Sequence, residues 1–412
     1  MELANYRAVS ACRVCGNGRL ESVLDLGTQV LTGVFPKAYD ASITSGPLQL
    51  VKCCGETACG LVQLAHSYDL GEMYGDNYGY RSGLNAHMVA HLQRKVERIK
   101  TLVELKPGDV VIDIGSNDST TLRAYPDDLT LIGVDPTGTK FLDFYPQHVQ
   151  LVPDFFPSTS LTSLLANRKA KVVTSFSMFY DLEDPLTFMA HVHDALTDDG
   201  VWVFEQSYMP AMLKTNSFDT VCHEHLEFYG LSQIKWMTDR VGLQILGCEF
   251  NNINGGSFSV SVRKATDNSL PKSIAKVLHD EKVEDLDTMR PYLAFADRTA
   301  SARDDINHFV DGARANGKSI SALGASTKGN VLLQYCGLDA SRIDFVGEVN
   351  PEKYGCVTPG TWIPIISQTE LLKQSPDYLL VLPWHFKSFF TDLAAFKQRS
   401  LVFPLPELEI IG

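Results

Sequence analysis

The segment from Ser217 to Tyr229 carries a dense group of side chains that can transfer protons. Within it, His223 and His225 lie on either side of Glu224, and further acids follow closely in the chain. An imidazole is well suited to accept a proton near neutral pH, and a neighbouring carboxylate can orient or tune it. The pattern therefore predicts general-base chemistry, in which one histidine removes a proton while the carboxylate assists.

Two other interpretations of this segment stay open. A His-x-His pair can bind zinc, although the segment lacks the H-E-x-x-H spacing of a metalloprotease helix. The same residues could instead form a hydrogen-bonded surface loop with no chemical role. The predicted position of the segment in the fold helps to decide between a general base, a metal site and a surface loop.

The segment follows a series of alternating strands and helices. Val110 to Ile114 is a continuous apolar run, which is typical of a parallel strand buried on both faces. Such repetition predicts a doubly wound sheet, which binds ligands outside the carboxyl ends of its strands. Because the segment comes after the strand predicted at 201–204, which is the fifth when the strand-like run before Asp154 is counted, we expect it at that edge. The predicted elements are strands at 110–114, 129–134, 171–176 and 201–204, a helix at 84–103, and a hairpin at 243–250 and 257–262.

Small and acidic residues end several of these strands. The turn from Asp113 to Asp118 (DIGSND) allows close approach of a ligand, Asp135 follows twenty residues later, and Asp154 precedes aromatic residues. Acids in this order suit a ribose diol and an adenine, and they outline a class I S-adenosylmethionine methyltransferase. The alternative is that acids end these strands by chance. The predicted cofactor residues are Asp113, Gly115, Asn117, Asp135, Asp154, Phe155 and Ser175.

Five of the nine cysteines fall in the first 60 residues. Cys12 and Cys15 form one C-x-x-C turn, and Cys59 forms a second pair with either Cys53 or Cys54. Four thiolates in two such turns predict one structural zinc ion per chain, which would help a small domain to fold. Free buried thiols clustered by chance are the alternative. The predicted zinc ligands are Cys12, Cys15, Cys53 and Cys59.

A second α/β series follows a helical stretch at about residues 270–315. Its strands are predicted at 319–323, 342–346, 378–382 and 401–403. The loop from Gly324 to Asn330 opens a helix, so its amides and Lys328 could face a diphosphate. Alternatively, these loops only connect elements. The predicted substrate-binding residues of this block are Lys328, Asn330, Glu348 and Trp384.

Charge and composition exclude several classes of protein. The 412 residues are 44% apolar and 21% charged, as in globular proteins, and the net charge is −13. A strongly acidic chain is a poor candidate for binding nucleic acid or anionic membranes, because both depend on positive charge. No apolar run is long enough to span a bilayer, and the first residues lack the apolar core of a signal peptide, so we expect a cytoplasmic protein.

Taken in order, these motifs resemble one known family over essentially the full chain. The family is the nucleotide-sugar C-methyltransferases of bacterial deoxysugar biosynthesis. The resemblance implies a class I methyltransferase core between an N-terminal zinc-binding domain and a C-terminal Rossmann-like α/β domain. The motifs that carry it are the two thiolate pairs, the turn at 113–118, Asp154-Phe155-Phe156, the segment 218–225, Asn254-Gly255-Gly256-Ser257 and Gly324-Ala325-Ser326-Thr327-Lys328.

The resemblance also implies roles for single residues. His225 matches the family's proposed base, Glu224 its acidic neighbour, and Tyr78 a tyrosine that reaches the active site from the N-terminal domain. Two positions depart from the family pattern. Cys222 stands where the family has tyrosine, and the segment 178–181 lacks a histidine found there. Tyr180 or Tyr229 is the candidate for the missing hydroxyl, and Tyr80 and His223 are further predicted substrate contacts.

The resulting prediction is methyl transfer to a sugar carbon. The resemblance implies S-adenosylmethionine as methyl donor and, as substrate, a nucleotide-linked 4-keto sugar that is methylated beside its carbonyl. Transfer to oxygen or nitrogen, and a non-enzymatic zinc scaffold, are the alternatives. We expect a monomer or simple homo-oligomer. The predicted domains are 1–83 for zinc, 84–268 for S-adenosylmethionine, and 269–412 for the nucleotide sugar.

Overall fold

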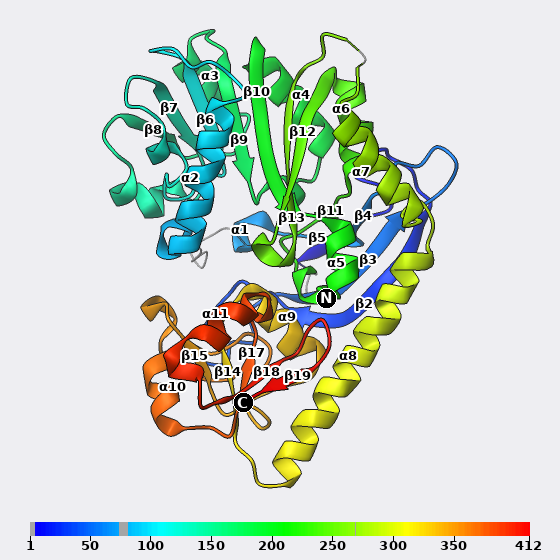
Figure 1. Cartoon of the computed structure of the whole chain (residues 1–412), viewed down its shortest axis with the longest axis vertical. Helices are drawn as coiled ribbons and strands as arrows, with labels where there is room; N and C mark the ends of the chain where they lie inside the picture. Colours follow the sequence, from blue (N-terminus) through cyan, green and yellow to red (C-terminus); the bar gives the residue numbers. More distant parts are fainter. Residues whose placement is uncertain (1–4, 74–80, 268) are drawn as a thin grey trace.

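The computed structural model describes residues 5–73, 81–267 and 269–412, and each third of the chain is built on its own main sheet. In Figure 1 the central sheet and the C-terminal sheet lie at opposite ends, and the N-terminal strands β2 to β4 lie between them. The long helix α8 (Arg290–Ala315) runs along one side of the molecule. Among the described residues, no helix is long and apolar enough to cross a membrane.

The N-terminal part forms an antiparallel sheet with the order β11-β4-β3-β2. Its side chains alternate along β3, where Leu48 and Leu50 are fully buried and their neighbours are partly exposed, as in a sheet covered on one face. The edge strand β11 (Glu227–Phe228) comes from the reactive segment, far along the chain, and pairs with β4. The other elements are β1 (Tyr6–Ala8), β2 (Leu20–Val30), β3 (Ser45–Cys53), β4 (Val62–Leu64), β5 (His66–Tyr68) and α1 (Leu70–Met73).

The central sheet has the order β12-β13-β10-β9-β6-β7-β8. The five strands from β10 to β8 are parallel, and β13 and β12 close the edge as the predicted antiparallel hairpin. Every residue of β6 is buried, as its apolar run predicts. The elements are α2 (Ala86–Lys100), β6 (Val110–Ile114), β7 (Thr130–Val134), β8 (Val149–Val152), α3 (Thr159–Leu165), β9 (Ala170–Phe176), α4 (Pro185–Ala195), β10 (Leu196–Ser207), α5 (Met209–Thr215), α6 (Leu231–Val241), β12 (Leu243–Asn251) and β13 (Ser257–Lys264).

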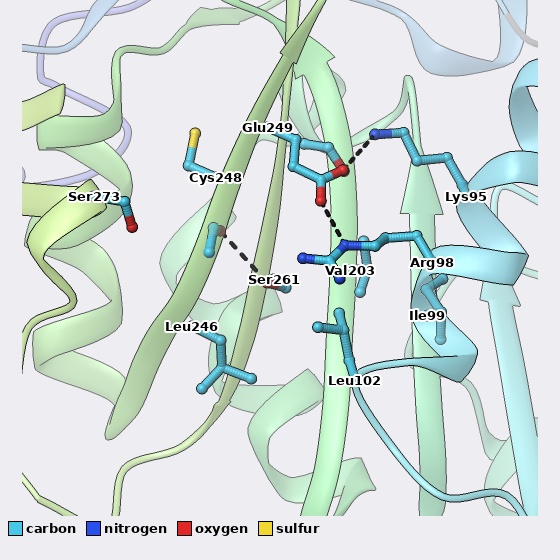
Figure 2. A pocket seen from close by; sticks show the side chains of 12 residues that line it. Lys95, Arg98, Ile99, Leu102, Val203, Leu246, Cys248, Glu249, Ser261 and Ser273 are labelled. Atoms are coloured by element: carbon cyan, nitrogen blue, oxygen red, sulfur yellow. Dashed lines mark hydrogen bonds and ion pairs between the residues drawn. The ribbon is translucent and has the colours of Figure 1, made fainter.

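A cavity of about 210 Å³ lies between α2 and the β12–β13 hairpin (Figure 2). Lys95 and Arg98 line it, but both contact the carboxylate of Glu249, at 3.7 and 2.6 Å. None of its lining residues is a predicted site residue. Because Glu249 already neutralises Lys95 and Arg98 and no predicted site residue lines the cavity, we do not take it as the candidate active site.

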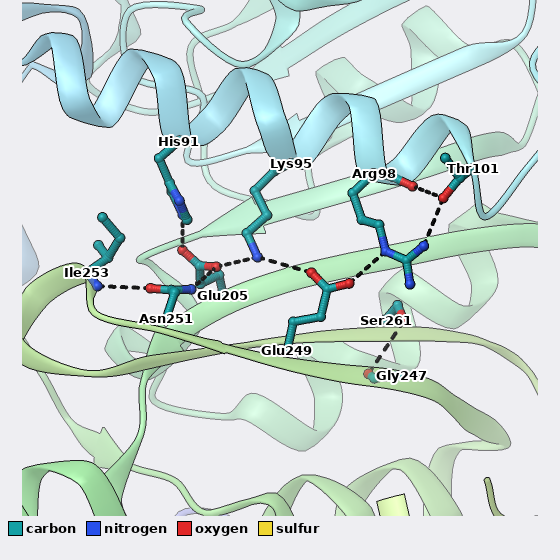
Figure 3. Close-up of polar contacts among 10 residues, drawn as sticks. All are labelled: His91, Lys95, Arg98, Thr101, Glu205, Gly247, Glu249, Asn251, Ile253 and Ser261. Atoms are coloured by element: carbon teal, nitrogen blue, oxygen red, sulfur yellow. Dashed lines mark hydrogen bonds and ion pairs between the residues drawn. The ribbon is translucent and has the colours of Figure 1, made fainter. Parts of the chain in front are cut away.

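A buried polar network fastens α2 to the sheet beside this cavity (Figure 3). The carboxylate of Glu205 in β10 lies 2.5 Å from Nε2 of His91 and 2.8 Å from Nζ of Lys95, and it accepts a hydrogen bond from Asn251. Burial acts to raise the pKa of Glu205, but the contacts with His91 and Lys95 outweigh it and lower that pKa. The network therefore holds a carboxylate ionised in the interior.

Replacing Glu205 with glutamine is expected to lower the free energy of unfolding by roughly 3 kcal/mol, because it leaves the buried Lys95 with only the more distant carboxylate of Glu249, at 3.7 Å. Urea unfolding measures this change. Since the folded pKa is lowered, the contribution is present above the unfolded pKa and disappears as pH falls through the folded one. Glu249→Gln, at a more exposed pair, should change the stability by about 1 kcal/mol or less. Equal effects of the two substitutions would contradict this role for Glu205.

The C-terminal part is a second, mostly parallel sheet with the order β16-β15-β14-β17-β18-β19. The strand predicted at 342–346 begins later, at Val346, because Arg314 holds Arg342 and Asp344 in the preceding loop. The three-residue strands β16 and β19 were not predicted. The elements are α7 (Lys272–Val283), β14 (Ile320–Leu323), α9 (Thr327–Tyr335), β15 (Val346–Glu348), β16 (Ile365–Ser367), α10 (Gln368–Gln374), β17 (Tyr378–Val381), α11 (Lys387–Asp392), β18 (Ser400–Phe403) and β19 (Glu409–Ile411).

One hydrophobic core joins the three parts of the chain. Leu50 of the N-terminal sheet, Phe218 of the reactive segment and Val331 of α9 belong to the same buried cluster. Phe218 is completely buried, with its ring 5.3 Å from that of Tyr335 in α9. The reactive segment is therefore held between the N-terminal and C-terminal sheets.

Candidate active site

His225 has the geometry of a base with one nitrogen available. Its Nδ1 lies 2.9 Å from the carbonyl oxygen of Thr220. A carbonyl can only accept a hydrogen bond, so Nδ1 carries the proton and Nε2 keeps a lone pair. Burial, together with the positive charge of Lys328, lowers the pKa of His225 to about 4. The imidazole is thus neutral at pH 7 and able to accept a proton.

This low pKa predicts the pH dependence of the reaction. A base works only when deprotonated, so kcat/KM should fall as the pH drops through about 4 rather than through about 6.5, the ordinary histidine value. Rate measurements between neutral and acid pH test this, with circular dichroism at each pH to verify folding. A half-maximal rate near pH 6.5 would contradict the assignment of His225 as the titrating base.

Glu224 lies where the three parts of the chain meet. Its carboxyl group is in contact with Gly33, in the loop after β2, so closely that a Cβ on this glycine would collide with Oε1. The same Cβ would lie 3.8 Å from Oγ1 of Thr327, at the start of α9. Burial raises the pKa of Glu224, and its Oε2 has no hydrogen-bond partner among the described residues. A buried acceptor left without a partner is available to a substrate.

Gly33→Ala is expected to lower kcat roughly 10²-fold, because the new methyl group must displace the Glu224 carboxylate. Cofactor affinity should stay unchanged, since Gly33 belongs to the N-terminal part. Gly312→Ala, on an open face of α8, is the matched control and should have wild-type activity. Steady-state kinetics and calorimetry separate the two effects. Full activity of Gly33→Ala would show that the position of Glu224 is unimportant.

The other predicted residues of this segment occupy different places. His223 is fully buried, and its ring contacts Tyr68 of β5 edge-on at 4.6 Å. Burial lowers the pKa of His223 to about 4. Its contact with substrate stays a prediction. Cys222 is also fully buried, and burial raises the pKa of its thiol.

Two tyrosines were candidates for the missing hydroxyl. Tyr180 lies beside the predicted base, with its ring 4.3 Å from that of His225. Tyr229 is instead buried in the core, 5.5 Å from the ring of Phe179. The geometry therefore favours Tyr180. Tyr78 and Tyr80 lie outside the described residues.

The predicted cofactor turn curls tightly at the end of β6. Gly115, Asn117 and Ser119 all have positive φ, at 75°, 48° and 65°. A Cβ on Gly115 would lie 3.1 Å from the side chain of Met178, so a larger residue would have to shift Met178 and would also be strained by the positive φ. Asp135 at the end of β7 accepts hydrogen bonds from the backbone amides of Asn117 and Thr137, which ties the turn to the next strand.

Four other predicted cofactor residues differ in how far they are exposed. Asp113 is buried and accepts a hydrogen bond from Thr174, and burial raises its pKa to about 7. Ser175 is also buried, and its hydroxyl accepts a hydrogen bond from the indole of Trp202. Asp154 is half-buried, and Phe155 is 53% exposed at the end of β8. Asp113 and Ser175 thus have interior partners, whereas Asp154 and Phe155 are accessible to a ligand.

The four predicted zinc ligands come together in the N-terminal part. The thiols of Cys12, Cys15, Cys53 and Cys59 all lie within 4.8 Å of one another. Four thiols at this separation suit a tetrahedral zinc ion. The thiol of Cys54 instead lies 3.7 Å from the sulfur of Met289, so Cys53 is the thiol that completes the cluster. Among the described residues no other group of three or more such ligands is found.

Two of the predicted substrate residues of the C-terminal sheet use their side chains in hydrogen bonds within the protein. Glu348 is buried and accepts hydrogen bonds from the amides of Ala325, Val349 and Asn350. It therefore positions loops. The side-chain amide of Asn330 donates to the carbonyl of Thr32, which links α9 to the N-terminal part.

Trp384 contacts the reactive segment, and Lys328 contacts the turn between β12 and β13. The indole of Trp384 donates to Oδ2 of Asp219 at 2.8 Å, and the ammonium of Lys328 donates to the carbonyl of Asn254 at 2.6 Å. Asp219 was within the segment singled out but was not predicted as a site residue. Burial raises its pKa, and its Oδ1 has no partner among the described residues.

Three family models match the chain one after another. A "Putative zinc binding domain" matches residues 12–74, a "Methyltransferase domain" matches residues 84–247, and a "C-methyltransferase C-terminal domain" matches residues 252–406. A curated relative, "C-methyltransferase NovU" from Streptomyces niveus, is 29% identical over 415 residues, which is 98% of each chain.

Solved methyltransferase structures are similar over less than half of the chain. The CcbJ methyltransferase from Streptomyces caelestis has 13% identity and a TM-score of 0.34, with 43% of this chain and 90% of that one covered. An S-adenosylmethionine-dependent methyltransferase from Clostridium acetobutylicum has 11% identity and a TM-score of 0.34, with 43% and 92% covered.

Proposed function

The chain belongs to a family of S-adenosylmethionine-dependent C-methyltransferases, and from that premise we propose that it methylates the carbon beside the carbonyl of a nucleotide-linked 4-keto sugar. S-adenosylmethionine supplies an electrophilic methyl group when it is bound. The matches to methyltransferase domains and to a curated C-methyltransferase argue against a zinc scaffold without enzymatic activity.

The observation that carries this proposal is the free Nε2 of a neutral His225. Carbon–hydrogen bonds beside a ketone are weakly acidic, and a positioned general base contributes a factor of about 10²–10⁴ to their cleavage. The bond between Nδ1 and Thr220 fixes the ring so that Nε2 is the accepting atom. A base is needed to make a carbon or a hydroxyl oxygen nucleophilic, whereas a neutral amine is nucleophilic without it. The base therefore disfavours transfer to nitrogen, and the match to C-methyltransferases favours carbon over oxygen.

The C-terminal sheet supports a nucleotide as part of the substrate. Its first strand, β14, has β15 on one side and β17 on the other, and ligands bind such sheets where the chain order reverses. The start of α9 follows β14, and its amides can meet a phosphate. Trp384, after β17, is at the same edge. A locally placed diphosphate site is compatible with the net charge of −13.

The decisive experiment incubates the protein with S-adenosylmethionine and a small panel of nucleotide-linked 4-keto sugars. Mass spectrometry detects a methylated product, and NMR assigns the new methyl group. We expect it on the carbon beside the carbonyl. A methyl group on oxygen or nitrogen would replace this proposal by the alternative methyltransferase, and absence of product from every sugar in the panel would refute the substrate class.

A further inference from the structure

Lys328 crosses from the C-terminal part into the methyltransferase part. It lies in the first turn of α9, yet its ammonium donates to the carbonyl of Asn254, in the turn between β12 and β13. An ammonium has three donors, and this bond uses one. Among the described residues Lys328 makes no ion pair within 4.0 Å, although its side chain is half-buried. Two donors of a partly desolvated cation are therefore open to a ligand.

The charge of Lys328 is directed at the reactive segment. It contributes to the lowered pKa of His225 and of His385, and it acts on the buried carboxyl group of Asp219. The packing brings the same parts of the chain together, because Thr327, which precedes Lys328, and the carboxyl group of Glu224, which precedes His225, both lie beside Gly33. Trp384 lies in the same region, because its ring packs near Gly255, next to Asn254, and its indole donates a hydrogen bond to Asp219.

From this geometry we propose that Lys328 is a catalytic residue, which binds the carbonyl oxygen of the sugar and stabilises the enolate, rather than a ligand of the diphosphate. The inference rests on the proposed function. The carbon–hydrogen bond breaks, its proton goes to Nε2 of His225, and its electron pair moves onto the carbonyl oxygen beside Lys328. The enolate carbon then forms the bond to the methyl group as the sulfur–methyl bond breaks, and the carbonyl is restored.

A cation at this position would both stabilise the enolate and keep His225 unprotonated before the reaction. A fixed cation in a partly dry site stabilises developing negative charge far better than water does. The same charge disfavours a proton on His225, so the base stays free before substrate arrives. A diphosphate is bulky and strongly hydrated, and it would be a poor fit beside the buried carboxyl group of Asp219.

The test compares Lys328→Met with the wild type in heavy water, with NMR to follow exchange of the hydrogen beside the carbonyl of a nucleotide-linked 4-keto sugar. We expect exchange at saturating sugar to slow by about 10²-fold or more, as on loss of one oxyanion donor. Affinity for thymidine diphosphate, measured by calorimetry, should stay within about twofold. Lys318→Met, which removes an exposed charge of the same C-terminal part, is the matched control and should match the wild type in both.

Several outcomes would overturn the proposal. Exchange by Lys328→Met within about threefold of the wild type would do so, and so would a loss of thymidine diphosphate affinity of about tenfold or more. Lys328→Arg keeps the charge and should exchange faster than Lys328→Met; equal rates would count against the role. If the wild type itself exchanges no hydrogen with any sugar, the proposed function falls and this inference with it.

Discussion

Replacement of His225 by alanine is expected to lower kcat for methyl transfer by a factor of about 10²–10⁴, the usual contribution of a general base. The physical reason is the loss of Nε2, the lone pair left free when Nδ1 is bound to Thr220. Affinity for S-adenosylmethionine should change by less than about threefold, because the predicted cofactor turn lies on other elements. Kinetics with a 4-keto sugar and calorimetry with S-adenosylmethionine measure the two quantities.

Two further variants sharpen this experiment. His225→Asn keeps a donor near the Thr220 carbonyl but has no basic nitrogen, so it should be as inactive as the alanine variant. His279→Ala, on the exposed face of α7, controls for loss of an imidazole and should keep full activity. Loss of cofactor affinity in His225→Ala, or activity within about tenfold of the wild type, would contradict the assigned role.

Features that depend on local sequence patterns were predictable. The buried run at 110–114, the N-G-G turn of the hairpin and the spacing of the cysteines each reflect a requirement of the chain nearby. The choice between Cys53 and Cys54 was not predictable, because it depends on Met289, which is 235 residues away. The sequence near Cys59 is compatible with either thiol.

It was also not possible to predict from the sequence that all three parts of the chain meet at the reactive segment. Strand β11 has only two residues, too few to show a period, and its partners Gln63 and Val62 lie 164 and 166 residues earlier in the chain. The role of Asp219 depends on Trp384, which is equally distant in sequence. Local patterns therefore locate the chemical groups, while long-range packing decides which of them face the substrate.

The zinc site leads to the second large effect. Cys12→Ser or Cys53→Ser is expected to abolish the one zinc ion per chain and with it the fold of the N-terminal part. Structural zinc contributes on the order of 10 kcal/mol or more to the folding of small domains, more than the stability of most of them. Metal analysis of the purified variants and their thermal unfolding measure this directly.

Loss of zinc should also slow methyl transfer strongly, although the zinc cluster holds none of the predicted catalytic residues. Strand β4 pairs with β11, and the amide of Leu64 donates to the carbonyl of Leu226, immediately after His225. The N-terminal part also supplies Gly33, against which Glu224 lies. When this part unfolds, the reactive segment loses one of its two supports, so kcat should fall about 10²-fold or more.

Cys54→Ser is the control that makes the experiment specific. Its thiol contacts the sulfur of Met289 and lies outside the four-thiol cluster, so the variant should keep one zinc ion and nearly full activity. Zinc lost from Cys54→Ser but kept by Cys53→Ser would reverse the ligand assignment. Zinc kept by Cys12→Ser would point instead to His223 and His225 as ligands. That result would also remove His225 as the base, because its lone pair would be bound to the metal.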